Sequence, residues 1–180
     1  ASCKAARFIN FCNNFSIPIV SLVDVPGFFP GVDQEHAGII RHGAKLIYAY
    51  ANATVPKITV ILRKSYGGAY IVMGSKELGA DFNFAWPSAQ IAVLGAQGAV
   101  TIMHGKTLAK EAEEQKRFLR EGLEKQYEKD FLHPFIAAES GYIDSIIEPD
   151  ETRIRIIKAL KISESKVETL PKRKNGNIPM

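Results

Sequence analysis

The chain has 180 residues and a formal net charge of +4, with 46% hydrophobic and 23% charged residues. This length can bury the core of one domain, and the composition is ordinary for a soluble globular protein. No stretch approaches the ~18 consecutive apolar residues of a membrane span, so no membrane segment is expected. The clearest basic cluster, residues 172–174, lacks the long stripe with interleaved aromatics of a nucleic-acid surface. It is interpreted as part of a solvated tail, and no nucleic-acid partner is expected.

The first residues predict a helix that begins at once, over residues 2–14, without a targeting segment. Because the chain starts at Ala1 rather than Met, we expect a fragment cut from a longer chain. The two cysteines, Cys3 and Cys12, are too few and too close for a disulfide framework or a zinc site. They fit a reducing, cytosol-like compartment.

Hydrophobic spacing predicts further elements along the chain. In order, these are a strand over 18–25, a helix over 34–53 stopped by Pro56, a strand over 58–62, a helix over 68–78, an irregular or short-strand region over 79–86, a strand over 89–94 and a helix after Gly98. An amphipathic surface helix is expected over 107–129, then a helix from His133-Pro134, a turn and strand over 141–147, a last helix capped by Asp150 or Thr152, and an extended tail over 165–180.

Three predicted strands end in glycine loops, at residues 26–31, at Gly67-Gly68 and at residues 95–98. Short apolar strands that open into a loop and then a helix indicate an α/β sheet. Ligands of such sheets sit outside the carboxyl ends of the strands, so the three loops are expected to share one edge. The first N–H groups of a helix have no helical partner and favour negative oxygen. The Gly67-Gly68 turn therefore predicts a backbone site for an anion or a developing oxyanion.

The sequence offers few candidate catalytic side chains. No Gly-x-Ser-x-Gly elbow, phosphate loop or dinucleotide fingerprint is present, and no histidine accompanies Ser65 in the sequence. Asp24 is the best-placed carboxylate, and its plainer interpretation is a hydrogen-bond acceptor that fixes a loop, a role also open to Asp81. Four histidines are interpreted as capping or packing residues: His36, His42, His104 and His133. A glycine pair after a strand is a weak signal alone, but three such loops favour chemistry on backbone donors.

Four segments resemble one known family: residues 23–31 (VDVPGFFPG), 63–70 (RKSYGGAY), 85–100 and 177–180. They look like the carboxyltransferase (β) subunit of biotin-dependent acyl-CoA carboxylases, and the propionyl-CoA and acetyl-CoA carboxylase β chains are the nearest likeness. The resemblance covers essentially the whole chain, in order. It is to the C-terminal half of such a subunit, so residues 1–180 are expected to form its C-terminal, biotin-side domain without the N-terminal half.

The resemblance implies an α/β fold of the crotonase type, a spiral of ββα units. It also implies a hexamer, a trimer of dimers, with each active site between the N-domain of one chain and the C-domain of its partner. Biotin would arrive on a separate carrier protein, and a biotin carboxylase subunit would be a further partner. The expected location is the cytoplasm, or the mitochondrial matrix in a eukaryote.

The implied reaction moves CO2 from carboxybiotin to the α-carbon of a short acyl-CoA, either acetyl-CoA or propionyl-CoA. By motif match, the backbone N–H groups of Gly68 and Ala69 would hold the ureido oxygen of biotin, and no side chain need act as the base. The adjacent Tyr66 and Gly67 would belong to the same binding site.

The resemblance gives roles to five further residues. Ile71 stands where propionyl-type members commonly have Asp, and an apolar residue there is compatible with acetyl-CoA. Gly95 and Ala96 would line the same pocket or pack beneath it. Phe28 and its neighbour Phe29 would wall the biotin cleft or fill core.

Two other functions remain open at this point. The same half-site could belong to a decarboxylase or transcarboxylase that takes CO2 from a malonyl-type CoA ester onto biotin. Alternatively, the chain could be an assembly domain without chemistry of its own. In each case the isolated chain is expected to be inactive, because it lacks the CoA-binding half.

Overall fold

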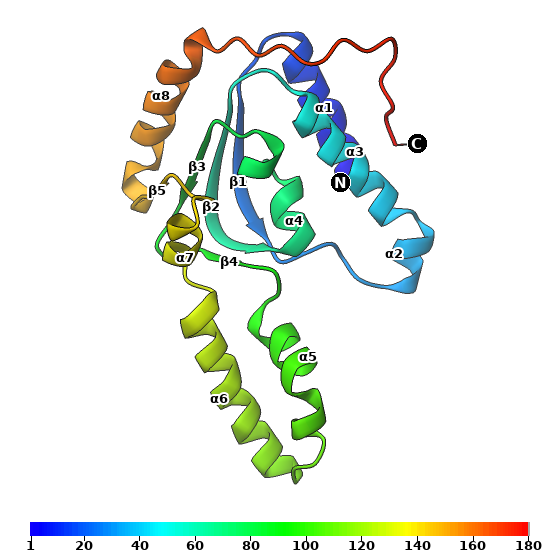
Figure 1. Cartoon of the computed structure of the whole chain (residues 1–180), viewed down its shortest axis with the longest axis vertical. Helices are drawn as coiled ribbons and strands as arrows, with labels where there is room; N and C mark the ends of the chain where they lie inside the picture. Colours follow the sequence, from blue (N-terminus) through cyan, green and yellow to red (C-terminus); the bar gives the residue numbers. More distant parts are fainter. Residues whose placement is uncertain (180) are drawn as a thin grey trace.

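A five-stranded parallel sheet forms the centre of the molecule (Figure 1). The structure is a computed structural model that describes residues 1–179. The strands run in the order β1-β2-β3-β5, and β4 pairs with the end of β2. Their bounds are β1 Ile19–Val25, β2 Lys57–Tyr66, β3 Phe82–Ala85, β4 Gln90–Ala92 and β5 Ser145–Ile146. The parallel α/β class predicted from the glycine loops is confirmed.

Helices cover both faces of this sheet. The α-helices are α1 Ser2–Asn14, α2 Val32–His36, α3 Ile39–Asn52, α4 Gly67–Val72, α5 Ala96–Leu108, α6 Glu113–Phe131, α7 Pro134–Glu139 and α8 Thr152–Ile162. Short 3-10 turns are η1 Lys76–Leu78, η2 Pro149–Glu151 and η3 Ser163–Ser165. The α5–α6 hairpin projects beyond the sheet, at the end opposite to the crossing of the C-terminal tail (Figure 1).

The longest strand, β2, has apolar residues on both of its faces. Ile58 and Val60 are fully buried in a cluster with Ala159 of α8. Ile61 points to the other face and packs with Val23 of β1 and Ala137 of α7. A strand buried on both faces reads as a continuous β-branched run rather than an alternating one. The run from Ile58 to Leu62 has this character.

The helix predicted over residues 34–53 is wrong as a single element. The structure divides it into α2 and α3, separated by Gly38 in the left-handed conformation with φ of 78°. Glycine enters this region without the steric cost of a Cβ, and it commonly ends helices. The apolar spacing continues past the break and does not reveal it.

The boundaries around the Gly67-Gly68 turn also differ from the prediction. Strand β2 extends to Tyr66, and α4 ends at Val72 rather than at residue 78. The stop comes from Gly74, whose φ is +82° and whose surroundings are tight: a Cβ there would lie 2.9 Å from the ring of Tyr50. The chain then continues as η1.

The second half of the chain follows the predicted order with shifted ends. Residues 107–112 end α5 and form a turn, so the charged helix α6 starts only at Glu113. His133 caps α7, because its Nδ1 accepts a hydrogen bond from the Phe135 amide at 3.4 Å. The predicted capping of the last helix is wrong. Neither Asp150 nor Thr152 is its N-cap, and the Thr152 hydroxyl instead accepts from Trp86 Nε1 at 2.9 Å.

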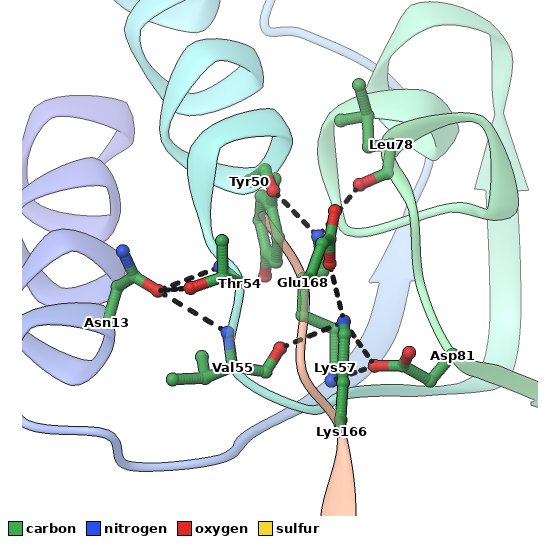
Figure 2. Close-up of polar contacts among 9 residues, drawn as sticks. All are labelled: Asn13, Tyr50, Thr54, Val55, Lys57, Leu78, Asp81, Lys166 and Glu168. Carbon is green, nitrogen blue, oxygen red and sulfur yellow. Dashed lines mark hydrogen bonds and ion pairs between the residues drawn. The ribbon is translucent and has the colours of Figure 1, made fainter. Parts of the chain in front are cut away.

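A buried lysine ties three elements together at the start of β2 (Figure 2). Lys57 is only 2% exposed. Its Nζ donates to the carbonyl oxygens of Tyr50 at 3.0 Å and Leu78 at 3.1 Å, and its backbone N–H donates to Asp81 Oδ2 at 2.8 Å. Burial lowers the pKa of Lys57. The amine thus joins the end of α3 and the η1 turn to the sheet.

A second lysine fastens the C-terminal tail to the same place (Figure 2). Lys166 Nζ lies 3.0 Å from Asp81 Oδ2, 2.9 Å from Glu168 Oε2 and 3.4 Å from the Val55 carbonyl oxygen. Burial acts to lower the pKa of Lys166, but hydrogen bonds to Glu168 and Asp81 outweigh it and the pKa is raised. Asp81 therefore fixes a loop, as the plainer interpretation predicts. Residues 166–179 carry no helix or strand. The tail predicted over 165–180 therefore starts one residue too early, since Ser165 closes η3, and its last residue lies outside the described residues.

Replacing Lys166 by Met is expected to lower the free energy of unfolding by about 1–3 kcal/mol, because Asp81 and Glu168 lose their cation. Since the pKa of Lys166 is raised above 10.5, this contribution is present below pH 10.5 and is lost as pH rises through the higher, folded-state pKa. Denaturant unfolding at pH 7 and pH 9 should therefore show the same loss. The control Lys161→Met changes an exposed lysine of α8 and should be nearly neutral; equal effects of the two variants would contradict the account.

Candidate functional site at the Gly67–Ala69 turn

The turn from β2 into α4 requires glycine at its first position. Gly67 has φ of +55°, and a Cβ there would lie 2.9 Å from the Val93 carbonyl oxygen. The contact arises because β2 pairs with β4 up to Tyr66, which brings the chain after β4 against the turn. At Gly68, by contrast, a Cβ would meet nothing within 4 Å. The backbone at Gly68 is therefore open to an incoming group, while the backbone at Gly67 is held against its neighbour.

One side of this turn faces a mainly apolar cavity of about 430 Å³. Gly67, Gly68 and Ile71 line it from α4, and Ile91 and Val93 line it from β4 and the residue after it. Its far wall comes from α7 and the loop that follows, through residues including Ile136, Ser140 and Tyr142. Gly67 and Gly68, both predicted from the sequence, thus line the same cavity as Ile71.

The other side of the turn faces a second cavity, of about 570 Å³. Ala69 lines it, together with Gly27, Phe28 and Phe29 of the loop after β1. The Phe28 ring also packs on α3, where a Cβ on Gly43 would lie 2.7 Å from it. Phe28 therefore both walls the cavity and fills space beside the core, whereas Phe29 is 71% exposed and fills none.

The remaining predicted residues pack behind the turn. The lining of the two cavities, within residues 1–179, does not include Tyr66, Gly95 or Ala96. A Cβ on Gly95 would lie 3.0 Å from the Tyr66 ring, and Ala96 is buried at the start of α5. The Tyr66 hydroxyl donates a hydrogen bond to Gln90 Oε1. Of the two predicted roles for Gly95 and Ala96, the geometry fits packing beneath the site.

The three glycine loops lie at one edge of the sheet, as predicted. Val25 of β1 is in register with Ser65 of β2, and Tyr66 of β2 is in register with Ala92 of β4. All of these strands are parallel, so their loops follow on the same side. The first two loops meet across the cavity at Ala69, and the second and third meet at the contact of Gly67 with Val93.

Three of the polar residues weighed in the sequence have a structural partner or are buried. Asp24 accepts hydrogen bonds from the Lys64 amide at 3.1 Å and from Arg63 at 2.9 Å, which lower the pKa of its carboxyl group. It fixes the strand end, as its plainer interpretation predicts. Ser65 is fully buried in β2, and its hydroxyl has no hydrogen-bond partner within residues 1–179. His42 lies 3.2 Å from Cys3 Sγ through Nδ1.

The sequence analysis missed the tyrosines of the first cavity. Tyr70 lines the cavity, and its hydroxyl is buried without a hydrogen-bond partner among the described residues. Burial raises the pKa of Tyr70, and nearby Glu77 and Tyr142 raise it further, so the phenol stays protonated. The only sequence signal for Tyr70 was its position after the glycine pair. Nothing in the sequence pointed to Tyr142.

Residues 1–179 contain no cluster of three or more His, Cys, Asp or Glu side chains placed to hold a metal ion. No helix in the described part of the chain is both long and apolar enough to cross a bilayer. Cys3 and Cys12 are both free thiols, one exposed and one buried.

Comparison with known proteins decides the family. Residues 1–178 match the model of the carboxyl transferase domain. The chain belongs to the carboxyl transferase domain family. Its sequence is 58% identical to the propionyl-CoA carboxylase beta chain of Saccharopolyspora erythraea, over 100% of this chain and 33% of that protein. It is 57% identical to a biotin-dependent acetyl-/propionyl-coenzyme A carboxylase beta5 subunit of Mycobacterium tuberculosis, again over 100% and 33% of the two chains.

The carboxyltransferase fold is also matched in three dimensions. The transcarboxylase 12S structure, solved with methylmalonyl-coenzyme A and methylmalonic acid bound and described as a hexamer assembly, has a TM-score of 0.92 and 50% sequence identity. The match covers 100% of this chain and 34% of the transcarboxylase chain. The predicted crotonase-like α/β fold is confirmed. The chain spans about a third of the length of the relatives it matches.

Proposed function

We propose that this carboxyltransferase domain supplies the biotin-side part of a site that moves CO2 from biotin to the α-carbon of a short acyl-CoA. The observation that carries the proposal is the Gly67–Ala69 turn, which contacts a cavity on each side. Family membership over residues 1–178 supports the same reaction. An enzyme of this kind needs a binding site for biotin and a binding site for the acyl-CoA. The two sites must meet where backbone donors can stabilise the negative charge that develops.

The backbone N–H groups of Gly68 and Ala69 are the proposed oxyanion donors. Both belong to the first turn of α4, where helical N–H groups have no partner within the helix. The space at Gly68 would admit the ureido group of biotin, and Ala69 faces the cavity walled by Phe28. These features fit biotin, which supplies the carboxyl group when bound. Preorganised donors of this kind each contribute about 3–4 kcal/mol of transition-state stabilisation.

Ile71 is the proposed selector of the acyl group. It lines the 430 Å³ cavity beside Gly68, so its side chain limits the room for the substrate's acyl chain. Ile71→Asp is expected to raise the kcat/KM ratio of propionyl-CoA over acetyl-CoA by at least about tenfold. The shorter aspartate side chain leaves room for the extra carbon of propionyl-CoA, and a difference of one methylene in a pocket typically changes kcat/KM by about tenfold or more. Ile71→Leu keeps the volume and the apolar character, and should leave the ratio within about twofold. A ratio unchanged in Ile71→Asp would contradict the role.

The proposed partners complete the subunit. The acyl-CoA surface would come from the two-thirds of a carboxyltransferase subunit that this chain does not span, and the whole would assemble as a hexamer, a trimer of dimers. Biotin would be delivered on a separate carrier protein that is served by a biotin carboxylase subunit. We place the protein in the cytoplasm, or in the mitochondrial matrix of a eukaryote, which agrees with its two free thiols.

A transcarboxylase is the second candidate function. The transcarboxylase 12S structure matches at a TM-score of 0.92 with 50% identity, which favours transfer of a carboxyl group from a malonyl-type CoA ester onto biotin. In this case the same turn and cavities would serve both directions of transfer.

The test uses a chimera of the Saccharopolyspora erythraea beta chain in which the matching third is replaced by residues 1–180. With a biotin-loaded carrier and biotin carboxylase, the chimera should carboxylate acetyl-CoA or propionyl-CoA in an ATP-dependent reaction. Carboxylation of biotin from methylmalonyl-CoA without any ATP-dependent carboxylation in the forward direction would favour the transcarboxylase. A chimera that folds and assembles but performs neither reaction would overturn the proposal.

A further inference from the structure

The hydroxyl of Tyr70 is a buried hydrogen-bond donor without a partner. Tyr70 lies in α4, two residues after Gly68, and its ring packs against the cluster that contains Val23 and Ile61. The hydroxyl oxygen is shielded from solvent and makes no hydrogen bond within residues 1–179. Buried polar groups in proteins nearly always have a partner, so this exception calls for an acceptor from another molecule.

Two other tyrosines show the usual arrangement. Tyr50 is buried, and its hydroxyl shares a hydrogen bond of 2.7 Å with the Ser21 hydroxyl. Tyr66, which is half-buried at the end of β2, donates to Gln90. Of these three side chains in the described part of the chain, Tyr70 alone has a donor left for a ligand.

The cavity beside the turn is the place from which a ligand can reach this hydroxyl. Tyr70 lines the cavity of about 430 Å³ together with Gly68 and Ile71. Glu77 and Tyr142 line it too, and both lie close enough to the Tyr70 hydroxyl to add to the rise in pKa that burial causes. The phenol therefore stays protonated and can donate to an oxygen acceptor in the cavity.

The proposed reaction leaves one group to fill this role. The ureido oxygen of biotin is assigned to the N–H groups of Gly68 and Ala69, and the thioester belongs with the acyl-CoA surface of the rest of the subunit. The acetyl and propionyl chains beside Ile71 offer only carbon and hydrogen. The CO2 in transfer carries oxygen acceptors and no donor. It is uncharged, which suits the mainly apolar walls, whereas bicarbonate would be repelled by the Glu77 carboxylate.

We propose that this cavity is a binding site for CO2 during its transfer, in which the Tyr70 hydroxyl donates a hydrogen bond to a CO2 oxygen. A CO2 molecule held there stays beside both substrates instead of escaping to solvent. The inference rests on the carboxyl-transfer function proposed above, and it adds the residue that retains the transferred group.

The coupling of the reverse reaction tests this role. Decarboxylation breaks the bond between the α-carbon and the distal carboxyl group of malonyl-CoA; the electron pair stays on the α-carbon, which takes up a proton, and CO2 is released. The chimera described above would be given free biotin and malonyl-CoA labelled in its distal carboxyl carbon. The label would then be counted as carboxylated biotin and as CO2 gas. In Tyr70→Phe the ratio of CO2 gas to carboxylated biotin should rise about five- to tenfold, because one hydrogen bond no longer holds the CO2.

Tyr48→Phe is the matched control for this ratio. It also removes a phenol hydroxyl, but this hydroxyl accepts a hydrogen bond from the Asn177 amide of the tail at 3.2 Å. Within residues 1–179 the lining of the two cavities does not include Tyr48, so the ratio should equal that of the parent chimera. An unchanged ratio in Tyr70→Phe, or an equal rise in Tyr48→Phe, would overturn the inference.

Melting temperatures separate ligand binding from a structural role of the hydroxyl. In the isolated chain, Tyr70→Phe removes a hydroxyl without a partner and should leave the melting temperature unchanged or slightly raised. Tyr50→Phe breaks the hydrogen bond with Ser21 and should lower the melting temperature by roughly 2–4 °C. An equal fall in both variants would contradict the inference, because the Tyr70 hydroxyl would then be bonded within the protein.

Infrared spectroscopy of CO2 keeps this inference distinct from the proposed function. The chimera, without biotin or a CoA ester, would be equilibrated with isotope-labelled CO2. A CO2 stretching band shifted from that of dissolved CO2 should appear in the parent chimera and be lost in Tyr70→Phe. An inactive chimera with this difference would reject the carboxyl-transfer proposal and keep the CO2 site. An active chimera whose spectrum equals that of its Tyr70→Phe variant would reject the CO2 site alone.

Discussion

Gly68→Pro is expected to lower kcat of the chimera by about 10²–10³-fold, because it removes one proposed oxyanion donor. Proline has no N–H, but it is tolerated in the first turn of a helix, where that N–H has no helical partner. Circular dichroism of the variant should therefore match that of the parent. The rate would be measured with biotin and acyl-CoA both saturating, so that the loss reports on the chemical step.

Gly68→Ala is the matched control for this prediction. It keeps the backbone N–H, and its Cβ would meet nothing within 4 Å in the folded chain. We expect it to retain the fold and to lose much less activity than Gly68→Pro, with its main effect on KM through the methyl group in the cavity. If Gly68→Pro were as active as Gly68→Ala, the backbone N–H would have no catalytic role.

Gly67→Ala is expected to damage the turn itself. The residue has φ of +55°, and the new Cβ would lie 2.9 Å from the Val93 carbonyl oxygen. The left-handed conformation alone costs a residue with a Cβ about 1–2 kcal/mol, which corresponds to a fall in melting temperature of roughly 2–8 °C for a chain of this size. The backbone contact adds to this cost. Activity should fall as well, because relief of the contact would move the Gly68 and Ala69 donors.

Gly98→Ala provides the comparison for Gly67→Ala. Gly98 lies inside α5, and a Cβ there would meet nothing within 4 Å. Alanine in a helix interior is favoured over glycine by about 0.5–1 kcal/mol, so this variant should be neutral or stabilised. A Gly67→Ala variant with the same melting temperature as Gly98→Ala would show that the turn is not strained by a Cβ.

The candidate site at Gly67 and Gly68 was predictable because its signal is local. A β-branched run followed by two glycines describes a strand, a tight turn and a helix within about ten consecutive residues. The walls of the cavities were not predictable in this way. Ile136 and Tyr142 reach the cavity from α7 and the loop after it, about 70 residues later in the sequence, and only the packing of α7 at the strand ends brings them there.

Two glycines show what the spacing of apolar residues does not predict. Gly38 and Gly43 both fall inside the helix predicted over 34–53. Gly38 adopts φ of 78° and ends one helix before the next, whereas Gly43 stays helical and makes room for the Phe28 ring. The difference lies in a tertiary contact that the spacing of apolar residues does not report. Lys57 is a similar case, since a lysine at the start of a strand gave no sign of being buried.

The most direct test of the central claim is the reverse reaction on free biotin. The isolated chain and the chimera would each be given malonyl-CoA or methylmalonyl-CoA, and the carboxylation of free biotin would be measured. The account predicts no turnover by the isolated chain and turnover by the chimera, which Gly68→Pro abolishes. Turnover by the isolated chain would contradict the half-site, and a folded, assembled chimera without turnover would contradict carboxyl transfer.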